Sequence, residues 1–182
     1  MDLKFSDEFN AIASLAEIEA VRTGHRRILP EHLLLGLIRH KENAARKALV
    51  SLGVDIKELK RRIDGKIFIE DAMEAIPRVM PTKAAAKLVH AASYEALKAG
   101  SGELLATHML LAITRSEDNA CRQILNEMGI TYEKLFGLLK SSSGLREDKT
   151  IRTPKMEEAI SALGEQLTNL LGSSGSKINY PS

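Results

Sequence analysis

Five histidines are the first candidates for chemistry in this chain: His25, His32, His40, His90 and His108. None of them forms the pair, four residues apart on a helix with a glutamate between, that zinc hydrolases use to bind metal. His32 and His108 stand at the same place in two similar segments, each at the start of an apolar helix. This placement favours a structural histidine that hydrogen-bonds the neighbouring loop, and a functional pair is the alternative.

The other reactive groups also lack catalytic surroundings. Cys121 is expected to be a small buried thiol, because no neighbouring base or cation is identified that would activate it. Residues 172–177 are rich in glycine and serine but lack the ending and the preceding strand of a phosphate-binding loop. The basic clusters at 22–27 and 57–62 carry no interleaved aromatic residues for stacking on bases. We therefore expect no enzyme activity, no cofactor, no metal and no nucleic-acid partner.

The composition is that of a soluble helical protein. The 182 residues are 44% hydrophobic but only 4% aromatic, without tryptophan, so the core must consist of Leu, Ile, Ala and Met. The 26 basic and 24 acidic residues nearly cancel, which leaves no overall field for nucleic acid or an anionic membrane. The apolar runs are far shorter than the ~20 residues that span a bilayer, and residues 1–5 lack the apolar core of a signal peptide. We expect a cytoplasmic protein without a membrane partner.

The elements that position these side chains occur twice. Residues 6–59 align without a gap on residues 82–135 at an offset of 76, and 15 of the 54 positions are identical. Most substituted positions keep their character. A tandem repeat of this size predicts two copies of one unit, each too small to be comfortably stable alone. The copies should therefore pack on each other with pseudo-two-fold symmetry.

Each copy predicts four helices. In the first copy Ser6, Asn43 and Asp55 are suited to be helix N-caps, and Gly24 and Gly53 to be left-handed helix ends. The helix that follows Pro30 is apolar on most of its circumference and should be buried. In the second copy the corresponding helices are expected at 83–99, 107–115, 118–128 and 132–140. The predicted fold class is therefore all-α, a tandem repeat of two four-helix units.

The predicted domain covers residues 1–140, with repeat one at about 5–64, a connector at 65–80 and repeat two at about 81–140. Residues 141–182 follow as a polar linker, a short amphipathic helix at 155–171 and a flexible tail. The apolar residues of that helix alternate at four and three positions, which is typical of a helix with one buried face. We expect it to pack on the domain. Self-association through 155–171, or docking on a partner, is the alternative.

One ordered pattern runs through both copies. In the first copy it comprises Phe5-Ser6, Gly24, and the segments 30–38, 43–45 and 52–54, and residues 82–130 repeat it. The pattern resembles the amino-terminal repeat domain of the Clp unfoldases, especially the ClpC type, over about residues 3–140.

The resemblance implies a non-enzymatic domain that serves an ATP-driven unfoldase of the chaperone and protease system. It implies binding of unfolded or tagged protein substrates, of adaptor proteins, and of Clp ATPase or peptidase subunits. The ATPase modules of such unfoldases do not follow in this sequence. The chain is therefore either a piece of an unfoldase or a stand-alone relative. A stand-alone accessory subunit that stabilises a Clp assembly, and a scaffold dimer unrelated to proteolysis, are the alternatives.

The resemblance also implies binding residues. ClpC-like domains recognise phosphorylated arginine, one site per repeat, through an acid just before the histidine and a Ser or Thr near the start of the first helix. Transferred to this chain, the first site is Ser6 with Glu31, and the second is Thr82 with Thr107. The carboxylate would pair with the guanidinium, and the hydroxyl and helix-start N–H groups would hold the phosphate. Thr107 lacks the carboxylate, so we expect the first site to bind. Glu31 as an acid favoured by the helix dipole is the alternative.

Overall fold

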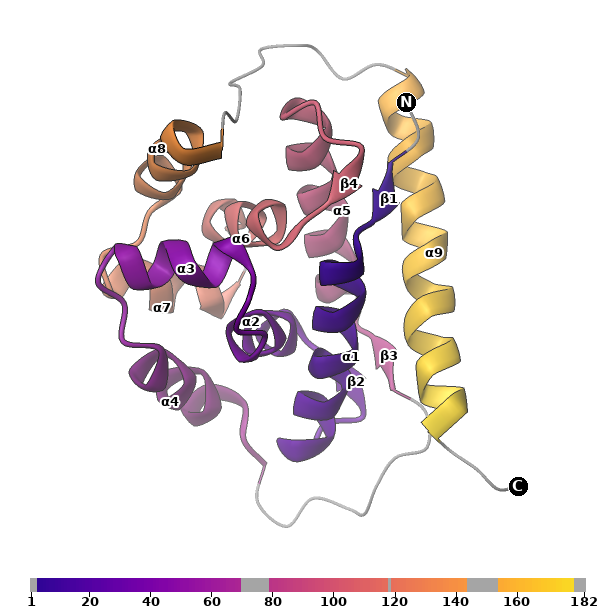
Figure 1. The fold of residues 1–182 in the computed structure, drawn as a ribbon. Helices are drawn as coiled ribbons and strands as arrows, with labels where there is room; N and C mark the ends of the chain where they lie inside the picture. Colours follow the sequence, from indigo (N-terminus) through magenta and orange to yellow (C-terminus); the bar gives the residue numbers. More distant parts are fainter. Residues whose placement is uncertain (1–2, 70–78, 118, 144–153, 179–182) are drawn as a thin grey trace.

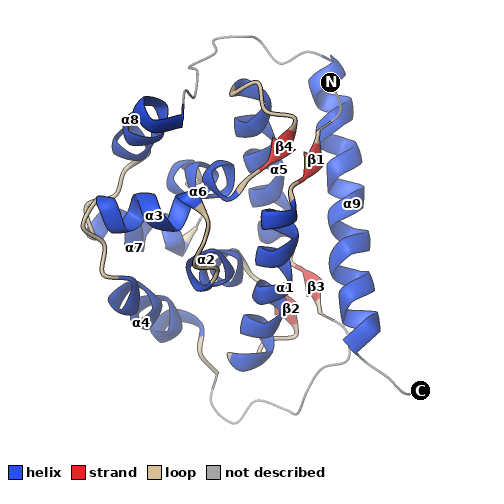
Figure 2. Ribbon diagram, in the orientation of Figure 1, coloured by secondary structure: helices blue, strands red, loops and turns tan. Residues whose placement is uncertain are grey.

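The computed structural model describes residues 3–69, 79–117, 119–143 and 154–178, and this part of the chain is predominantly helical (Figures 1 and 2). The first repeat contains four helices and the second repeat four more, and a further helix follows. The helices are α1 (Asp7–Arg22), α2 (Pro30–Arg39), α3 (Ala44–Ser51), α4 (Ile56–Ile67), α5 (Lys83–Lys98), α6 (Ala106–Arg115), α7 (Ala120–Glu127), α8 (Tyr132–Ser143) and α9 (Pro154–Ile178). The all-α prediction is confirmed.

The two repeats pack on each other through equivalent helices. Inside each repeat the first helix packs on the second, as α1 on α2 and α5 on α6. Between the repeats, α2 meets α7 where α6 meets α3, and α4 meets α7 where α8 meets α3. Each contact has a counterpart when the repeats are exchanged, which is the pseudo-two-fold arrangement expected from the duplication. α2 and α6 lie at the centre of this arrangement (Figure 1).

Four two-residue strands, which the sequence did not predict, cross from one repeat to the other. β1 (Lys4–Phe5) pairs in parallel with β4 (Glu103–Leu104), and β2 (Arg27–Ile28) pairs in parallel with β3 (Met80–Pro81). Each pair joins the segment before the first helix of one repeat to the loop after the first helix of the other. Strands of this length carry no period-two signal, because only their pairing partner defines them.

The predicted helix ends are largely confirmed. Ser6, Asn43, Asp55 and Thr82 each accept a backbone N–H of the first turn that they precede. The glycines that end the first and third helices of both repeats have positive φ angles between 71° and 89°. Two boundaries differ: α4 continues to Ile67, into the predicted connector, and α8 continues to Ser143, into the predicted linker. Residues 70–78 of the connector and 144–153 of the linker lie outside the described part of the chain.

The contact between α1 and α2 depends on a residue without a side chain. A Cβ atom at Gly36 would lie 2.7 Å from the carbonyl oxygen of Ile12 and 3.0 Å from the backbone nitrogen of Ala16. Both atoms belong to the α1 backbone, which cannot move without disturbing the helix.

Replacing Gly36 by alanine should therefore lower the free energy of unfolding by about 1–3 kcal/mol, as overpacking does in other cores. Gly137 in α8 is the matched control, because nothing lies within 4 Å of the Cβ that alanine would add there. Gly137→Ala should be neutral or stabilise by up to ~1 kcal/mol, the usual difference in helix propensity. Urea unfolding of both variants measures the difference. Equal stabilities for the two variants would show that α1 and α2 are not in close contact.

α9 packs against the domain, as expected. It contacts α5 and α1, the first helices of the two repeats, and it also contacts β3 (Figure 1). Ile160, Leu163 and Leu167 on its apolar face are each at most 2% exposed. The apolar face that self-association through 155–171 would use is therefore already covered. The helix also runs on to Ile178, which corrects the flexible tail predicted from residue 172. A docked helix can extend through weak helix formers because propagation costs much less than nucleation.

Candidate functional site

Ser6 caps α1, and its hydroxyl is fully engaged. The Oγ atom donates to the carbonyl of Leu104 at 2.7 Å and accepts the N–H of Phe9 at 3.0 Å. The residue is buried, with 3% of its surface exposed. Leu104 belongs to β4 in the second repeat, so Ser6 ties the start of the first repeat to a loop of the second. Its only hydroxyl hydrogen is already donated inside the protein.

Thr82 has the equivalent role in the second repeat. Its Oγ1 atom donates to the carbonyl of Ile28 at 3.1 Å and accepts the N–H of Ala85 at 3.1 Å. Ile28 belongs to β2 in the first repeat, so this contact also crosses between the repeats. Unlike Ser6, Thr82 is only half-buried. Its only hydroxyl hydrogen is likewise donated inside the protein, so Thr82 differs from Ser6 in exposure and not in hydrogen bonding.

The structure does not bring Ser6 and Glu31 together. Ser6 stands at the beginning of α1, whose 16 residues span about 24 Å. Glu31 stands near the other end of α1, because its neighbour His32 places Nε2 2.8 Å from the Oγ1 of the α1 C-cap Thr23. One small ligand cannot contact both Ser6 and Glu31. The grouping of site residues by repeat is thus corrected by the crossed connections.

Two cross-repeat corners replace the within-repeat sites. The first corner comprises Ser6 and the first turn of α6, in which Thr107 is the second residue. The second corner comprises Thr82 and the first turn of α2, in which Glu31 is the second residue. The residues predicted to form two sites are therefore exchanged between them. The carboxylate and the more accessible hydroxyl fall in the same corner.

The first corner is closed by a carboxylate of its own. Glu8 Oε2 accepts the backbone N–H of Ala106 at 2.8 Å, which satisfies the first free donor of α6. Thr107 beside it is 8% exposed. In the second corner Ala84 stands in place of Glu8, and Pro30, which has no N–H, stands in place of Ala106. The second corner thus has neither the closing carboxylate nor the donor that it would satisfy.

The charges at the two helix starts also favour an anion in the second corner over the first. The first turn of α1 carries Asp7 and Glu8, whereas the first turn of α5 carries no acid and begins with the exposed Lys83. The positive end of the α5 dipole therefore has no acidic side chain in its own first turn, which favours an anion there. Glu31, half-buried in the first turn of α2, adds a carboxylate to the same corner. The second corner can accordingly hold a ligand with one anionic and one cationic group.

The two equivalent histidines are structural, as the sequence favoured. His32 Nδ1 accepts the N–H of Leu29 at 2.8 Å, and His108 Nδ1 accepts the N–H of Leu105 at 3.0 Å. Each ring thus does the work of the glutamate in a capping box. Burial lowers the pKa of His32 from 6.5 to about 3, with a smaller effect of His25 and Arg22, and lowers the pKa of His108 to about 4. Both rings are neutral at physiological pH.

Cys121 is inert, which confirms the buried thiol expected from the sequence. It lies at the start of α7 with no exposed surface, and burial raises the pKa of its thiol well above 9.0, with a smaller contribution from the nearby Glu31. Among the described residues, no three His, Cys, Asp or Glu side chains are placed to hold a metal ion together.

A buried carboxylate at the same place in each repeat was missed by the sequence analysis. Glu19 pairs with Arg22 and Arg39, and Glu95 pairs with Lys98 and Arg115. Tyr132 also donates its hydroxyl to Glu95 at 3.0 Å. Glu19 and Glu95 are identical at the 76-residue offset, as are Arg39 and Arg115. Identical charged residues in both copies were the available signal, and they mark ion pairs that hold the first and second helices together.

Comparison with known proteins gives one consistent result. The family model described as the Clp repeat (R) N-terminal domain matches residues 4–128 and again residues 80–145. The chaperone protein ClpB of Oceanobacillus iheyensis is 28% identical over 172 residues, which are 91% of this chain and 21% of that protein. The negative regulator of genetic competence ClpC/MecB of Bacillus subtilis is 30% identical over 131 residues, which are 72% of this chain and 16% of that protein.

Solved structures show the same fold. The Hsp104 N-terminal domain from Candida albicans superimposes with a TM-score of 0.64 at 17% identity, covering 80% of this chain and 95% of that domain. The N-terminal domain of the chaperone ClpD from Arabidopsis thaliana gives a TM-score of 0.59 at 15% identity, covering 75% and 92%. In the described part of the chain, no helix has the length and apolar character needed to cross a membrane.

Proposed function

The chain belongs to the Clp repeat N-terminal domain family, and from this premise we propose that it recognises proteins for an ATP-driven Clp unfoldase. The repeated match of the family model to residues 4–128 and 80–145 is the observation that carries the proposal. The chain spans only about a fifth of the length of the ClpB relative and less of the ClpC relative. The ligands that we propose from the family match are unfolded or tagged substrates and adaptors. We propose no catalytic role for the chain.

Within this function we propose that the second corner binds phosphorylated arginine on substrate proteins. The phosphate would be held at the start of α5 by the first backbone N–H groups of the helix and by Lys83, with the Thr82 hydroxyl exchanging its bond to Ile28 for one to the phosphate. The guanidinium would pair with Glu31, across the β2–β3 connection that joins the two helix starts. Charge-assisted hydrogen bonds at both ends of one side chain give affinity and discriminate against ordinary arginine. The first corner, closed by Glu8 and without an acid at Thr107, is proposed not to bind.

Titration with a phosphoarginine peptide, an unmodified arginine peptide and a permanently unfolded protein tests both levels of the proposal. We expect the phosphoarginine peptide to bind, and Glu31→Gln to weaken it about tenfold or more through loss of the guanidinium partner. Thr107→Val at the equivalent place in the first corner is the control and should change nothing. Calorimetry or fluorescence anisotropy measures the affinities.

The outcomes separate the two levels. Binding of the unfolded protein without preference for phosphoarginine would reject the phosphoarginine site and keep the general function. Equal losses from Glu31→Gln and Thr107→Val would reject the second corner as the site. Binding of none of the three ligands would reject protein recognition by this chain.

A further inference from the structure

A hollow of about 390 Å³ lies where the end of α6, α7 and the start of α8 meet. It belongs entirely to the second repeat and involves neither Thr82 nor Glu31. The side chains that matter for its chemistry are Thr114, Arg115, Arg122, Asn126, Thr131 and Tyr132. The hollow therefore offers two guanidinium groups, polar neighbours and one aromatic ring.

Among the described residues no carboxylate pairs with the guanidinium of Arg122, and Glu133 is the acidic side chain that lines the same hollow. Arg122 is half-buried, and its backbone N–H is bonded to Asn119. Its guanidinium makes no ion pair and no hydrogen bond with any residue in the described segments. A charged group that is partly removed from water loses hydration and needs an anion or hydrogen-bond acceptors in return. The position thus favours a ligand that brings a negative group.

The first repeat supplies an internal comparison. Arg46 is the residue equivalent to Arg122, and its Nε atom donates to the carbonyl of Ile38 at 2.7 Å. Arg46 thereby satisfies a carbonyl in the last turn of α2. At the equivalent place in the second repeat, Thr114 donates its own hydroxyl to the carbonyl of Leu111, and Arg122 makes no such bond. The guanidinium of Arg46 is thus hydrogen-bonded within its own repeat, whereas the guanidinium of Arg122 makes no equivalent bond.

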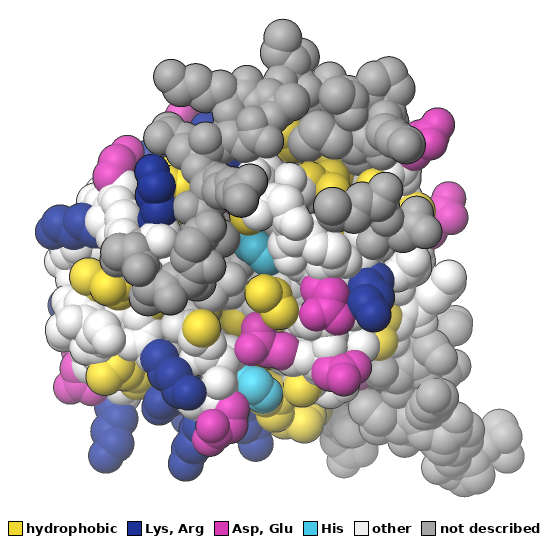
Figure 3. All heavy atoms as spheres, turned by 45° about the horizontal axis from the view of Figure 1, so that its top comes forward, with side chains coloured by type: hydrophobic (Ala, Val, Ile, Leu, Met, Phe, Trp, Pro, Cys, Tyr) yellow, Lys and Arg dark blue, Asp and Glu magenta, His cyan; other side chains and the backbone are white. Residues whose placement is uncertain are grey.

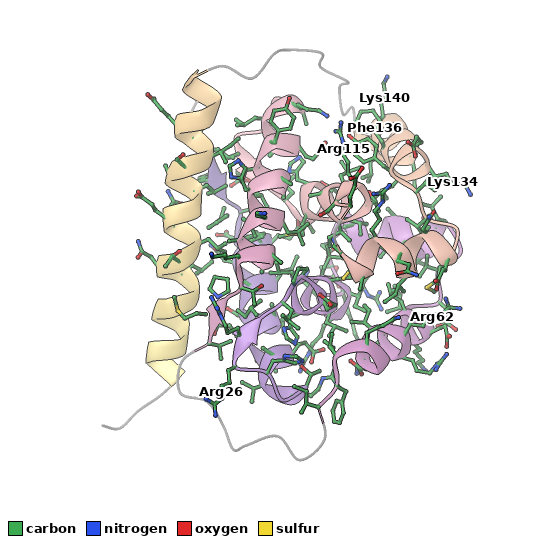
Figure 4. All side chains as sticks on the ribbon, turned by 180° about the vertical axis from the view of Figure 1, so that it is seen from behind. Arg26, Arg62, Arg115, Lys134, Phe136 and Lys140 are labelled. Carbon is green, nitrogen blue, oxygen red and sulfur yellow. The ribbon has the colours of Figure 1, made fainter. Side chains whose placement is uncertain are left out.

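The other large side chains of the hollow are already paired inside the protein, and the ring of Tyr132 stacks on Phe136 with 5.7 Å between the ring centres. The Arg115 guanidinium lies 5.0 Å from the centre of the Tyr132 ring and pairs with Glu95 at 3.1 Å. Glu95 also serves Lys98, so one carboxylate is shared between two cations. Figure 4 labels Arg115 on α6 together with Phe136 and Lys140 on α8, the helix packed beside it.

The second repeat differs from the first in the charge at one further position. In the first repeat, Asp64 pairs with Arg22 at 2.7 Å and so supplies a second carboxylate beside Glu19. Lys140 takes the place of Asp64 in the second repeat. At this position the second repeat thus carries a positive charge where the first repeat carries a negative one.

We propose that this hollow binds an acidic segment of a partner protein, whose carboxylate pairs with the guanidinium of Arg122. This site goes beyond the proposed function, because it is separate from the second corner and selects a different chemical group. An extended polyanion such as nucleic acid fits less well. Nucleic acid is bound through many phosphate contacts, whereas this hollow has a single guanidinium without a carboxylate partner among the described residues. Acidic and basic side chains both occur on the face of the molecule in Figure 3.

The test is an NMR titration of the isotope-labelled full chain with an unlabelled peptide of alternating glutamate and glycine. We expect shifts of amide signals at the end of α6, in α7 and at the start of α8. Binding should weaken as salt is added. Arg122→Gln should weaken it at least tenfold, through loss of a charge-assisted hydrogen bond. Arg46→Gln, the equivalent change in the first repeat, should leave it within twofold of the wild type.

Two further titrations make the proposal decidable. The glutamine analogue of the peptide should not bind, because it lacks the carboxylates. Inorganic phosphate alone tests whether the hollow takes any anion. The proposal is overturned if phosphate shifts these signals and the acidic peptide does not, if the glutamine analogue binds equally, or if Arg46→Gln and Arg122→Gln have the same effect. Shifts confined to the Thr82 and Glu31 region would also overturn it, whatever the outcome with phosphoarginine.

Discussion

Replacing Leu163 by alanine is expected to lower the free energy of unfolding by about 2–5 kcal/mol, the usual cost of truncating a buried leucine. Leu163 has no exposed surface and lies at the centre of the α9 face that packs on α1 and α5. The upper end of this range applies only if α9 stays docked in the variant. If the helix detaches, the loss is limited to the free energy with which α9 docks.

Gln166 is the matched control for this experiment, because it lies on the exposed side of the same helix. Gln166→Ala should change stability by a few tenths of a kcal/mol at most, through helix propensity alone. Urea unfolding of the full chain, followed by circular dichroism, compares the two variants. If Leu163→Ala proves as stable as Gln166→Ala, α9 does not pack on the domain in solution.

Acidification is expected to destabilise the protein through its two buried histidines. The pKa values of His32 and His108 are lowered to about 3 and about 4, whereas an unfolded histidine has a pKa of 6.5. Below pH 6.5 these histidines bind protons in the unfolded chain but stay neutral in the folded chain. The free energy of unfolding therefore decreases as pH falls. Each histidine should remove about 2 kcal/mol between pH 6.5 and 5.

Glu17 raises the free energy of unfolding as pH falls over the same range, opposite to the two histidines. This carboxyl is buried in α1, its Oε1 makes no hydrogen bond in the described structure, and burial raises its pKa from 4.5 to about 7. The folded state therefore binds a proton that the unfolded state has released, and stability rises as pH falls from 7 to 4.5. Glu17 thus offsets about 2 kcal/mol of the loss between pH 6.5 and 5, the contribution of one histidine.

Three proteins separate these contributions. The wild type should lose about 2 kcal/mol between pH 6.5 and 5, His32→Gln should lose almost nothing, and Glu17→Gln should lose about 4 kcal/mol. The glutamine introduced by His32→Gln can still accept the N–H of Leu29, as in a capping box. Gln166→Ala, which removes no titratable group, is the control and should follow the wild type. Urea unfolding at several pH values gives the slopes, and parallel curves for all variants would contradict the assignment of both buried groups.

Much of the fold could be predicted from short-range patterns in the sequence. Ser6, Thr82 and Asn43 act as N-caps because a side-chain oxygen can satisfy a free N–H of the turn that follows it. The buried α2 was predictable from its nearly continuous apolar residues. The pattern of α9 predicted one buried face, but only packing on α1 and α5 decided which surface covers it. The helix continues to Ile178, past the glycine and serine residues at which local propensity predicts an end.

The candidate site residues could be named from the repeated sequence pattern. Which of them lie together in one site could not be predicted from it. The expectation that Ser6 works with Glu31 assumed that each repeat forms its own site. The strand pairs β1–β4 and β2–β3 instead connect each repeat to the other. The preference for the first site over the second likewise changes, because Glu8 closes the corner that contains Ser6. The difference between Arg46 and Arg122 was also invisible in the sequence, where the two residues are identical.

The sequence by itself determined the helices, their ends, the duplication and the family, because these depend on neighbours along the chain or on a repeated order of residues. The tertiary structure alone decided which hydroxyl meets which helix start, how the guanidinium groups of Arg46 and Arg122 come to differ, and where α9 docks. The first of these features depends on contacts between the two repeats, such as Ser6 to Leu104, which are 98 residues apart. Local periodicity contains no information about a partner at that distance, so only the packed chain could supply it.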